Sequence, residues 1–220
     1  MSGQVQPDWK SVRLVRVHDW LPISAAALVT GAMALLLASV LTQNGDDAAA
    51  TLMIVEEASG RWLGGALMFF IASVGLVLGL PSIIVLVRGP GRRTTMAACA
   101  VLAIGYLGTA AYAAMLVFLR SLVVTDSVDA EALADVSDEA GVLTFIAIWI
   151  GAFYIGELLL AVALLRAGTE VIGLWVPALL LAHVVVSLGA RAAPDWVSQA
   201  SVLLAALPLC AIGIRVTQPT

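Results

Sequence analysis

Long apolar runs separated by short polar segments make up most of the chain. Six of these runs are long enough to cross the hydrocarbon core of a bilayer, which takes about 20 helical residues at a rise of about 1.5 Å each. They lie at about 22–42, 63–87, 95–119, 141–165, 171–190 and 196–216. None of the polar segments between them is long enough to form a folded domain. The pattern therefore predicts an all-α fold, a polytopic bundle of six transmembrane helices in which residues 1–220 form a single integral-membrane domain.

The composition agrees with this prediction. Hydrophobic residues make up 61% of the 220 residues and charged residues only 12%, with a mean hydropathy of +1.03. A soluble domain is about half apolar and about a quarter charged. Both cysteines, Cys99 and Cys210, fall inside apolar runs. We therefore expect them to be small buried residues rather than a disulfide or a redox pair.

The distribution of basic residues predicts the orientation. An even number of spans puts both termini on one side, and that side carries eight of the eleven Lys and Arg residues. These eight are Lys10, Arg13, Arg16, Arg88, Arg92, Arg93, Arg166 and Arg215. Because cytoplasmic loops are enriched in Lys and Arg, we expect the protein to lie in the plasma membrane with both termini in the cytoplasm.

The connections between the runs are of two kinds. "RGPGRR" (88–93) and "RAGTE" (166–170) predict tight turns on the inner side. The outer loops 43–62 and 120–141 are longer and contain ten carboxylates. They predict an acidic cap that attracts cations or a basic protein partner. Each loop is also rich in helix formers, and either forms a short helix at the membrane interface or remains a solvated connection.

Small residues on the apolar runs predict close helix packing. Gly75-x-x-x-Gly79 and Ala152-x-x-x-Gly156 have the spacing that lets two membrane helices approach closely. We expect these faces to pack within the chain, although they would serve an oligomer equally well. Pro81 lacks a backbone N–H and is expected to bend its helix near the inner end.

A carboxyl group inside an apolar run is the most unusual feature of the sequence. Glu157 lies nine residues before Arg166, about 13 Å into the bilayer from the inner end of its span. An ionised side chain near the bilayer centre costs on the order of 3 kcal/mol. We therefore expect Glu157 to face the bundle, protonated or paired, with Tyr154 on the same helix face. It is either a site for a proton, a cation or a polar ligand, or a neutral carboxyl that bonds a neighbouring helix.

His183 is the only histidine inside a predicted span. It lies about 19 Å from the inner edge of that span, so its depth differs from that of Glu157 by about 6 Å. This difference favours a water bridge between the two side chains over a direct bond. Trp175 lies two turns before His183 and is included as a candidate site residue. A buried histidine is either a structural group with a satisfied hydrogen bond or a ligand-binding group.

Hydroxyl-bearing residues recur at a spacing of three in the third run. Tyr106, Thr109 and Tyr112 place their hydroxyl groups along one stripe of a helix. Together with Tyr154 they either line a cavity or form hydrogen bonds between helices.

Several chemistries are absent from the sequence. It contains no HExxH or GxSxG motif, no pair of aspartates inside a span, and no span with two histidines for haem. It also lacks a basic patch with interleaved aromatic residues, as nucleic-acid binding would require. We therefore expect no cofactor, no metal, no nucleic-acid partner and, on balance, no enzyme activity.

Three segments carry a resemblance to a known family. "GALMFFIASVGLVLGLPSIIVLVR" is followed by "CAVLAIGYLGTAAYAA" and later by "GELLLAVALLRAGTEVIGLWVPALLL". This pattern resembles a bacterial family of six-span membrane proteins known only as a domain of unknown function. In that family the position of Thr109 is often basic. The resemblance implies the topology and no activity, so it assigns no functional residue.

Two classes of function remain after these exclusions. The first is a sensor, an accessory subunit, or a binder of a lipid or small hydrophobic ligand within the bundle. The second is a small proton-coupled transporter that uses Glu157 with His183 and the tyrosines. An intramembrane enzyme acting on lipid is a weaker third. A cavity that reaches Glu157 would favour ligand binding or transport, whereas a dry, packed environment would favour a structural role.

Overall fold

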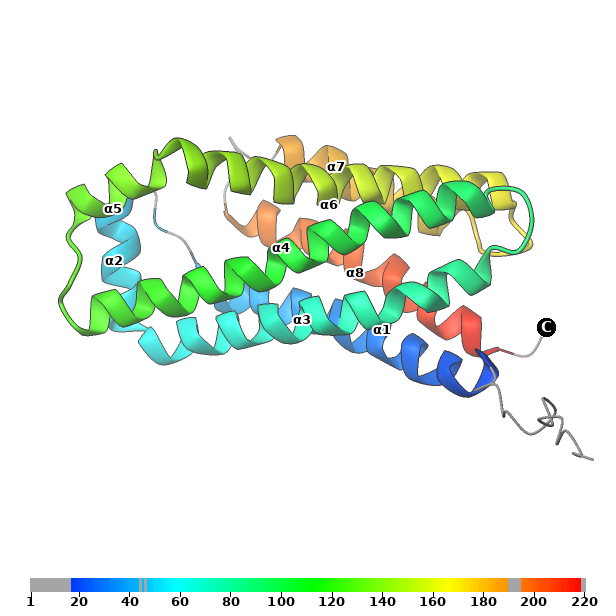
Figure 1. The fold of residues 1–220 in the computed structure, drawn as a ribbon, viewed down its shortest axis with the longest axis horizontal. Coiled ribbons are helices and arrows are strands. Elements are labelled where there is room, and N and C mark those ends of the chain that lie inside the picture. Colours follow the sequence, from blue (N-terminus) through cyan, green and yellow to red (C-terminus); the bar gives the residue numbers. More distant parts are fainter. Residues whose placement is uncertain (1–16, 44, 46, 190–194, 219–220) are drawn as a thin grey trace, which may run out of the picture.

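The structure is a computed structural model that describes residues 17–43, 45, 47–189 and 195–218. Within these residues the chain forms eight α-helices and no strand (Figure 1). The helices are α1 (Val17–Leu41), α2 (Ala48–Glu57), α3 (Ser59–Leu86), α4 (Arg92–Val124), α5 (Ala130–Ser137), α6 (Ala140–Ala167), α7 (Trp175–Gly189) and α8 (Asp195–Thr217).

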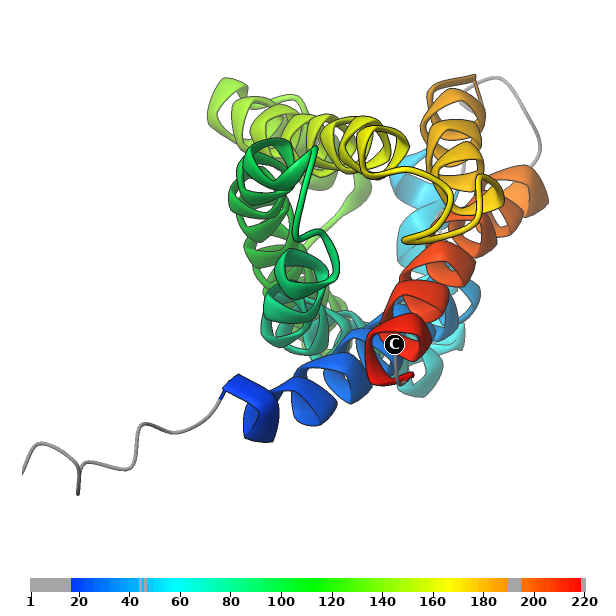
Figure 2. The same ribbon diagram turned by 90° about the vertical axis from the view of Figure 1, so that its right-hand side faces the viewer.

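Six of the helices form a closed ring. Viewed from one end, α1, α3, α4, α6, α7 and α8 follow one another around the bundle in chain order (Figure 2). Each packs against the next, α8 closes the ring against α1, and α3 also contacts α8. Short connections join α3 to α4 and α6 to α7, and they leave the two helices of each pair side by side.

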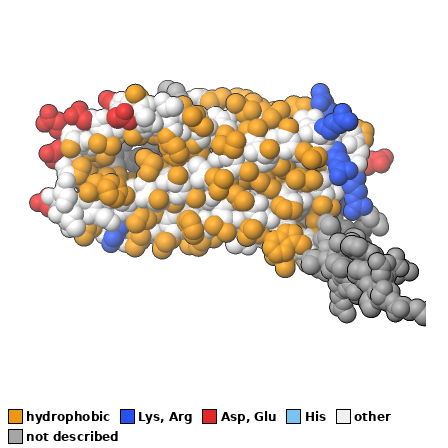
Figure 3. Space-filling model, viewed as in Figure 1, with side chains coloured by type: hydrophobic (Ala, Val, Ile, Leu, Met, Phe, Trp, Pro, Cys, Tyr) orange, Lys and Arg blue, Asp and Glu red, His pale blue; other side chains and the backbone are white. Residues whose placement is uncertain are grey.

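In the part of the chain that the structure describes, five helices are long and apolar enough to cross a membrane. They belong to α1, α3, α4, α6 and α8, and large apolar side chains cover much of the outer surface (Figure 3). The prediction of an all-α, multi-pass membrane bundle is confirmed at this level.

The helix predicted at 171–190 is shorter in the structure. The helix α7 has 15 residues, about 22 Å, and residues 171–174 form a turn instead of its first helical turn. Gly168, with φ of 90°, ends α6. Arg215 then donates hydrogen bonds to the carbonyl oxygens of Glu170 and Val171, which holds this connection in a non-helical path.

Charged residues separate to the two ends of the bundle (Figure 3). The basic end contains Arg88, Arg92, Arg93, Arg166 and Arg215, around the connections 87–91 and 168–174. The acidic end contains α2 and α5 with most of the carboxylates. Lys10, Arg13 and Arg16, which also entered the orientation prediction, lie outside the described residues.

Both acidic loops contain a short helix, as one of the two interpretations predicted. The carboxylates of Asp47 and Asp129 cap α2 and α5 by accepting from the N–H of Ala50 and Ala132, at 2.7 and 2.8 Å. The loops are shorter than the predicted 43–62 and 120–141, because α3 begins at Ser59 and α4 continues to Val124.

Glycines bring helix backbones together inside the bundle. A Cβ atom on Gly31 of α1 or Gly75 of α3 would lie less than 3 Å from the backbone of the other helix. A Cβ on Gly156 of α6 would likewise lie 2.7 Å from the Leu102 side chain of α4. The small-residue faces are therefore used for packing within one chain.

Pro81 has no N–H to bond the carbonyl oxygen of Val77 in α3, and a side chain from α1 binds the backbone beside this gap. The hydroxyl of Ser24, which is fully buried, donates to the carbonyl oxygen of Leu78 at 2.8 Å and accepts from the N–H of Ser82 at 3.1 Å. Leu78 and Ser82 are the partners of a normal i to i+4 helical bond. Ser24 thus bridges two backbone groups that have no water to bind in an apolar environment.

We expect Ser24→Ala to destabilise the protein by about 1–3 kcal/mol, because both backbone groups lose their buried partner. Thermal unfolding of the purified protein in detergent measures the effect. Ser121→Ala is the matched control, since the Ser121 hydroxyl is exposed and bonds only within its own helix. Equal unfolding temperatures for the two variants would contradict the bridging role.

Candidate functional site

A direct hydrogen bond joins the two ionisable side chains that the sequence placed in the membrane. Nδ1 of His183 on α7 lies 2.6 Å from Oε2 of Glu157 on α6, and both residues are almost completely buried. Either the Nδ1–H donates to the carboxylate, or the carboxylic acid donates to Nδ1. Glu157 faces the bundle interior, as predicted.

The predicted water bridge between these residues is wrong. The predicted depth of His183 was measured from Glu170, on the assumption that its helix begins near residue 171. Measured along the observed helices, Glu157 is about 15 Å from the end of α6, and His183 is about 12 Å from the start of α7. The remaining difference of about 3 Å is within the reach of the side chains.

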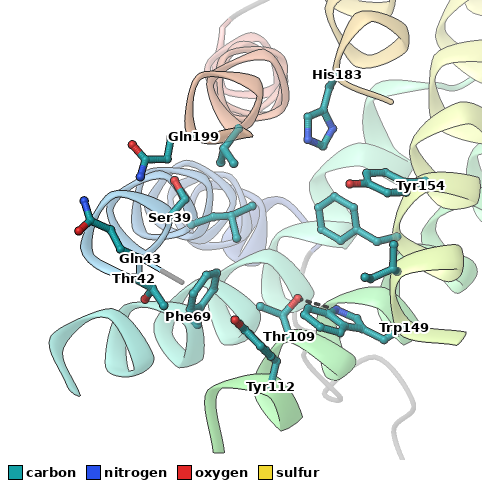
Figure 4. Close-up of a pocket in the computed structure, with 14 residues that line it drawn as sticks. Ser39, Thr42, Gln43, Phe69, Thr109, Tyr112, Trp149, Tyr154, His183 and Gln199 are labelled. Atoms are coloured by element: carbon teal, nitrogen blue, oxygen red, sulfur yellow. Dashed lines mark hydrogen bonds between the residues drawn. The ribbon is translucent and has the colours of Figure 1, made fainter. Parts of the chain in front are cut away.

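A cavity of about 320 Å³ lies beside this pair, between the helices of the ring (Figure 4). Its residues come from the halves of α1, α3, α4, α6, α7 and α8 that are nearer the acidic end. Five aromatic side chains line it: Phe69, Tyr112, Trp149, Phe153 and Tyr154.

Polar groups complete the lining of the cavity. They are Ser39, Thr42, Gln43, Thr109, His183 and Gln199, with Leu35, Ile150 and Val202 as aliphatic neighbours. His183 belongs to both the cavity and the buried pair, and Figure 4 shows its ring and the Tyr154 hydroxyl directed toward the cavity. A ligand in the cavity would therefore contact His183, which in turn is hydrogen-bonded to the buried carboxyl group of Glu157.

The aromatic rings position one another. Tyr112 stacks on Trp149 with ring centroids 4.8 Å apart and meets the edge of Phe69 at 5.3 Å. The indole N–H of Trp149 donates to the hydroxyl of Thr109 at 3.2 Å. These contacts fix three of the rings without any ligand present.

The ring of His183 is held in a similar way. Phe153 and Tyr154 meet it edge to face, at centroid distances of 6.2 and 5.8 Å. Together with the bond to Glu157, these contacts fix the orientation of the imidazole at the cavity wall.

Two polar atoms in this core have no hydrogen-bond partner among the described residues. They are Oε1 of Glu157 and the hydroxyl oxygen of Tyr106. Buried polar atoms are almost always hydrogen-bonded in native proteins. The pair therefore retains hydrogen-bonding capacity that the observed contacts do not use.

The structure assigns different places to the residues that the sequence singled out. His183, Tyr154, Tyr112 and Thr109 line the cavity, which supports the cavity interpretation of the hydroxyl stripe. Glu157 lies behind His183 and does not line it.

Two of the predicted site residues lie elsewhere. Tyr106 is completely buried against Phe153 and does not reach the cavity wall. Trp175 is 53% exposed at the start of α7, near the basic end, so its inclusion in the site is wrong. Trp175 lies eight residues before His183, near the same face of α7, but two helical turns separate its ring from the cavity.

Several lining residues were not identified from the sequence. Phe69 and Phe153 look like ordinary apolar residues of a span, and Gln43 and Gln199 look like residues of span ends. Trp149 gave a usable signal, because it lies deeper than the membrane interface where tryptophan is usually enriched.

Among the described residues, no group of three or more His, Cys, Asp or Glu side chains is arranged to hold a metal ion. Cys99 is buried, Cys210 is half-buried, and both are free.

Comparison with known proteins adds no assignment. No protein-family model, no curated protein and no solved structure matches the chain. The resemblance to the six-span bacterial family therefore stays a prediction.

We expect Glu157→Ala to destabilise the protein by about 1–3 kcal/mol, because Nδ1 of His183 loses its buried partner. Glu157→Gln keeps the size and one hydrogen bond, so it should unfold close to the wild type. His183→Ala should destabilise similarly, and the double alanine variant should lose less than the sum of the single variants. Thermal unfolding in detergent measures all four proteins. Strictly additive losses would show that the two side chains do not interact.

Proposed function

We propose that this multi-pass membrane protein binds a lipid or a small hydrophobic ligand in the cavity of its acidic half, as a sensor, an accessory subunit or a binding protein. The observation that carries this proposal is a cavity of about 320 Å³ with an aromatic wall and a few polar groups, beside the buried Glu157–His183 pair. Small-molecule sites have this character, with a mostly apolar lining and few convergent polar groups.

The proposed topology has six spans with both termini in the cytoplasm of a bacterium. In support, α7 is apolar and completes the ring between α6 and α8. The start of α1 and the end of α8 both lie at the basic end (Figure 1). The positive-inside rule then places the acidic end, with its half of the cavity, outside the cell.

The charged ends and the apolar outer surface indicate which partners the protein binds. The acidic end offers a surface for a basic protein partner outside the membrane. The apolar outer surface contacts membrane lipid. Self-association through small residues has less support, because Gly75 and Gly156 already pack inside the chain.

A proton-coupled transporter is the second candidate function. The direct contact between the buried Glu157 and the cavity-lining His183 favours it, because a proton on this pair would sense what occupies the cavity. If the protein is such a transporter, wild-type liposomes should take up ligand in response to a pH gradient, and the Glu157→Gln protein should fold and bind but lose this uptake. If the protein only binds its ligand, neither protein should show uptake driven by a pH gradient.

The topology predicts how two engineered cysteines react in intact cells. In a variant with Cys99 and Cys210 replaced by serine, Ala130→Cys on α5 should react with a membrane-impermeant maleimide added from outside. Gly89→Cys, in the exposed connection between α3 and α4, should react only after permeabilisation. The reverse pattern would show that the orientation is inverted.

The binding proposal predicts that small molecules protect the cavity. Ser39 lines it and makes only a local hydrogen bond to Leu36, so Ser39→Cys in the same serine background should fold and react with methyl methanethiosulfonate. At least one of three compact probes should slow this reaction: choline, 3,3-dimethylbutan-1-ol or 3,3-dimethylbutanoate. Ser127→Cys, exposed in the acidic end, is the control and should be unaffected.

If none of the three probes protects Ser39→Cys, the cavity is not a small-molecule site. The filling substitution Gln199→Trp checks the assay itself. It places a large ring on the same cavity wall and should slow the reaction whether or not a probe is present.

A further inference from the structure

The wall of the cavity has the composition of a cation-binding cage. The faces and edges of five aromatic rings, Phe69, Tyr112, Trp149, Phe153 and Tyr154, surround one space. An aromatic face carries partial negative charge and attracts a positive group placed within about 6 Å of its centre. Three of the rings are already fixed by contacts with one another and with Thr109, so little ordering is needed when a ligand enters.

The charges around the cavity are mostly negative. Among the described residues that line it, none is Lys, Arg, Asp or Glu, so the charge comes from the acidic end. The acidic end contributes nine carboxylates to the described residues, against the two guanidinium groups of Arg61 and Arg120. Arg61 is exposed and donates to Gln43 at the cavity rim, and Arg120 donates to the carbonyl oxygen of Ser59. The resulting potential concentrates cations and repels anions near this half of the bundle.

Behind the inner wall of the cavity lies a buried acid. Glu157 bonds His183 through Oε2, while Oε1 has no partner among the described residues. The pair carries a net negative charge only when Glu157 is ionised and His183 is neutral. In that state a positive group beside His183 would be attracted and an anion repelled, whereas a neutral molecule would gain only from burial.

We propose that the ligand of this cavity is a small organic cation, an ammonium group on a hydrophobic body. This inference rests on the proposed binding function and names the chemical class of the ligand. Strongly hydrated inorganic cations fit less well, because the lining is rich in rings and poor in the carboxylate and carbonyl oxygens that such ions require. A quaternary or alkylated ammonium loses little hydration and gains contact with the rings.

The three probes of the protection assay test this inference because they share a compact branched head and differ in charge. Choline is the cation, 3,3-dimethylbutan-1-ol replaces its nitrogen by carbon, and 3,3-dimethylbutanoate is the anion. We expect choline to protect Ser39→Cys at about tenfold lower concentration than the alcohol, and the anion to protect least. Equal protection by the alcohol, or better protection by the anion, would overturn the inference while leaving the binding function intact. No protection by any probe would overturn both.

Two neighbouring phenylalanines distinguish attraction of a cation by the rings from a purely steric effect of the ring on the cavity. Phe69 lines the cavity, whereas Phe70 is 53% exposed on the outer surface. Phe69→Leu keeps an apolar side chain and removes the ring, so it should weaken protection by choline several-fold and leave protection by the alcohol unchanged. Phe70→Leu should change neither. Equal weakening for both probes in Phe69→Leu would show that the ring only shapes the cavity, and would contradict the cage.

Discussion

A polar group inside an apolar helix has no water to bind, so it must find its partner within the protein, and the bundle is organised around this constraint. Ser24 of α1 binds two backbone groups of α3 beside Pro81. Glu157 of α6 finds His183 of α7. Each contact also fixes how two neighbouring helices are rotated and how far one slides along the other. The polar groups therefore specify the register of the bundle, which apolar packing alone leaves loose.

Glycines determine where the helices come together and where rings can be placed. On one side of the bundle, Gly31 and Gly75 let α1 and α3 approach backbone to backbone. On the other, the missing side chains of Gly105 and Gly108 leave room on α4 for Phe153 and Trp149 of α6. The aromatic wall of the cavity is thus a consequence of two glycines on the facing helix. A methyl group at Gly108 would lie 2.2 Å from the Trp149 ring, so the ring would have to move.

The cavity, the buried pair and the surface charge form one electrostatic arrangement. The carboxylates collect at the end nearer the cavity, and five of the arginines collect at the other end (Figure 3). This asymmetry gives the cavity its mostly negative surroundings. His183 connects the cavity to the buried pair, because one side of its ring faces the cavity and its Nδ1 contacts the carboxyl group of Glu157 behind it. A ligand in the cavity and a proton on the pair would therefore act on the same few atoms.

The sequence by itself determined the helices, the separation of charge and the inward orientation of Glu157. These depend on the length of apolar runs, on local turn residues and on the cost of a charge in lipid, all of which can be evaluated one segment at a time. The small-residue faces could also be predicted, because Gly75 and Gly156 occur at a spacing that lets membrane helices approach closely.

Only the tertiary structure decided which side chains meet. The direct Glu157–His183 bond depends on α7 beginning at Trp175, which Arg215 of α8 helps to fix from a distance in sequence. The start of α7 also places Trp175 away from the cavity, and the packing of α3 in the ring brings Phe69 into the cavity wall. Depth along one helix follows from counting residues, but the rotation and offset between two helices come from contacts that the linear pattern does not contain.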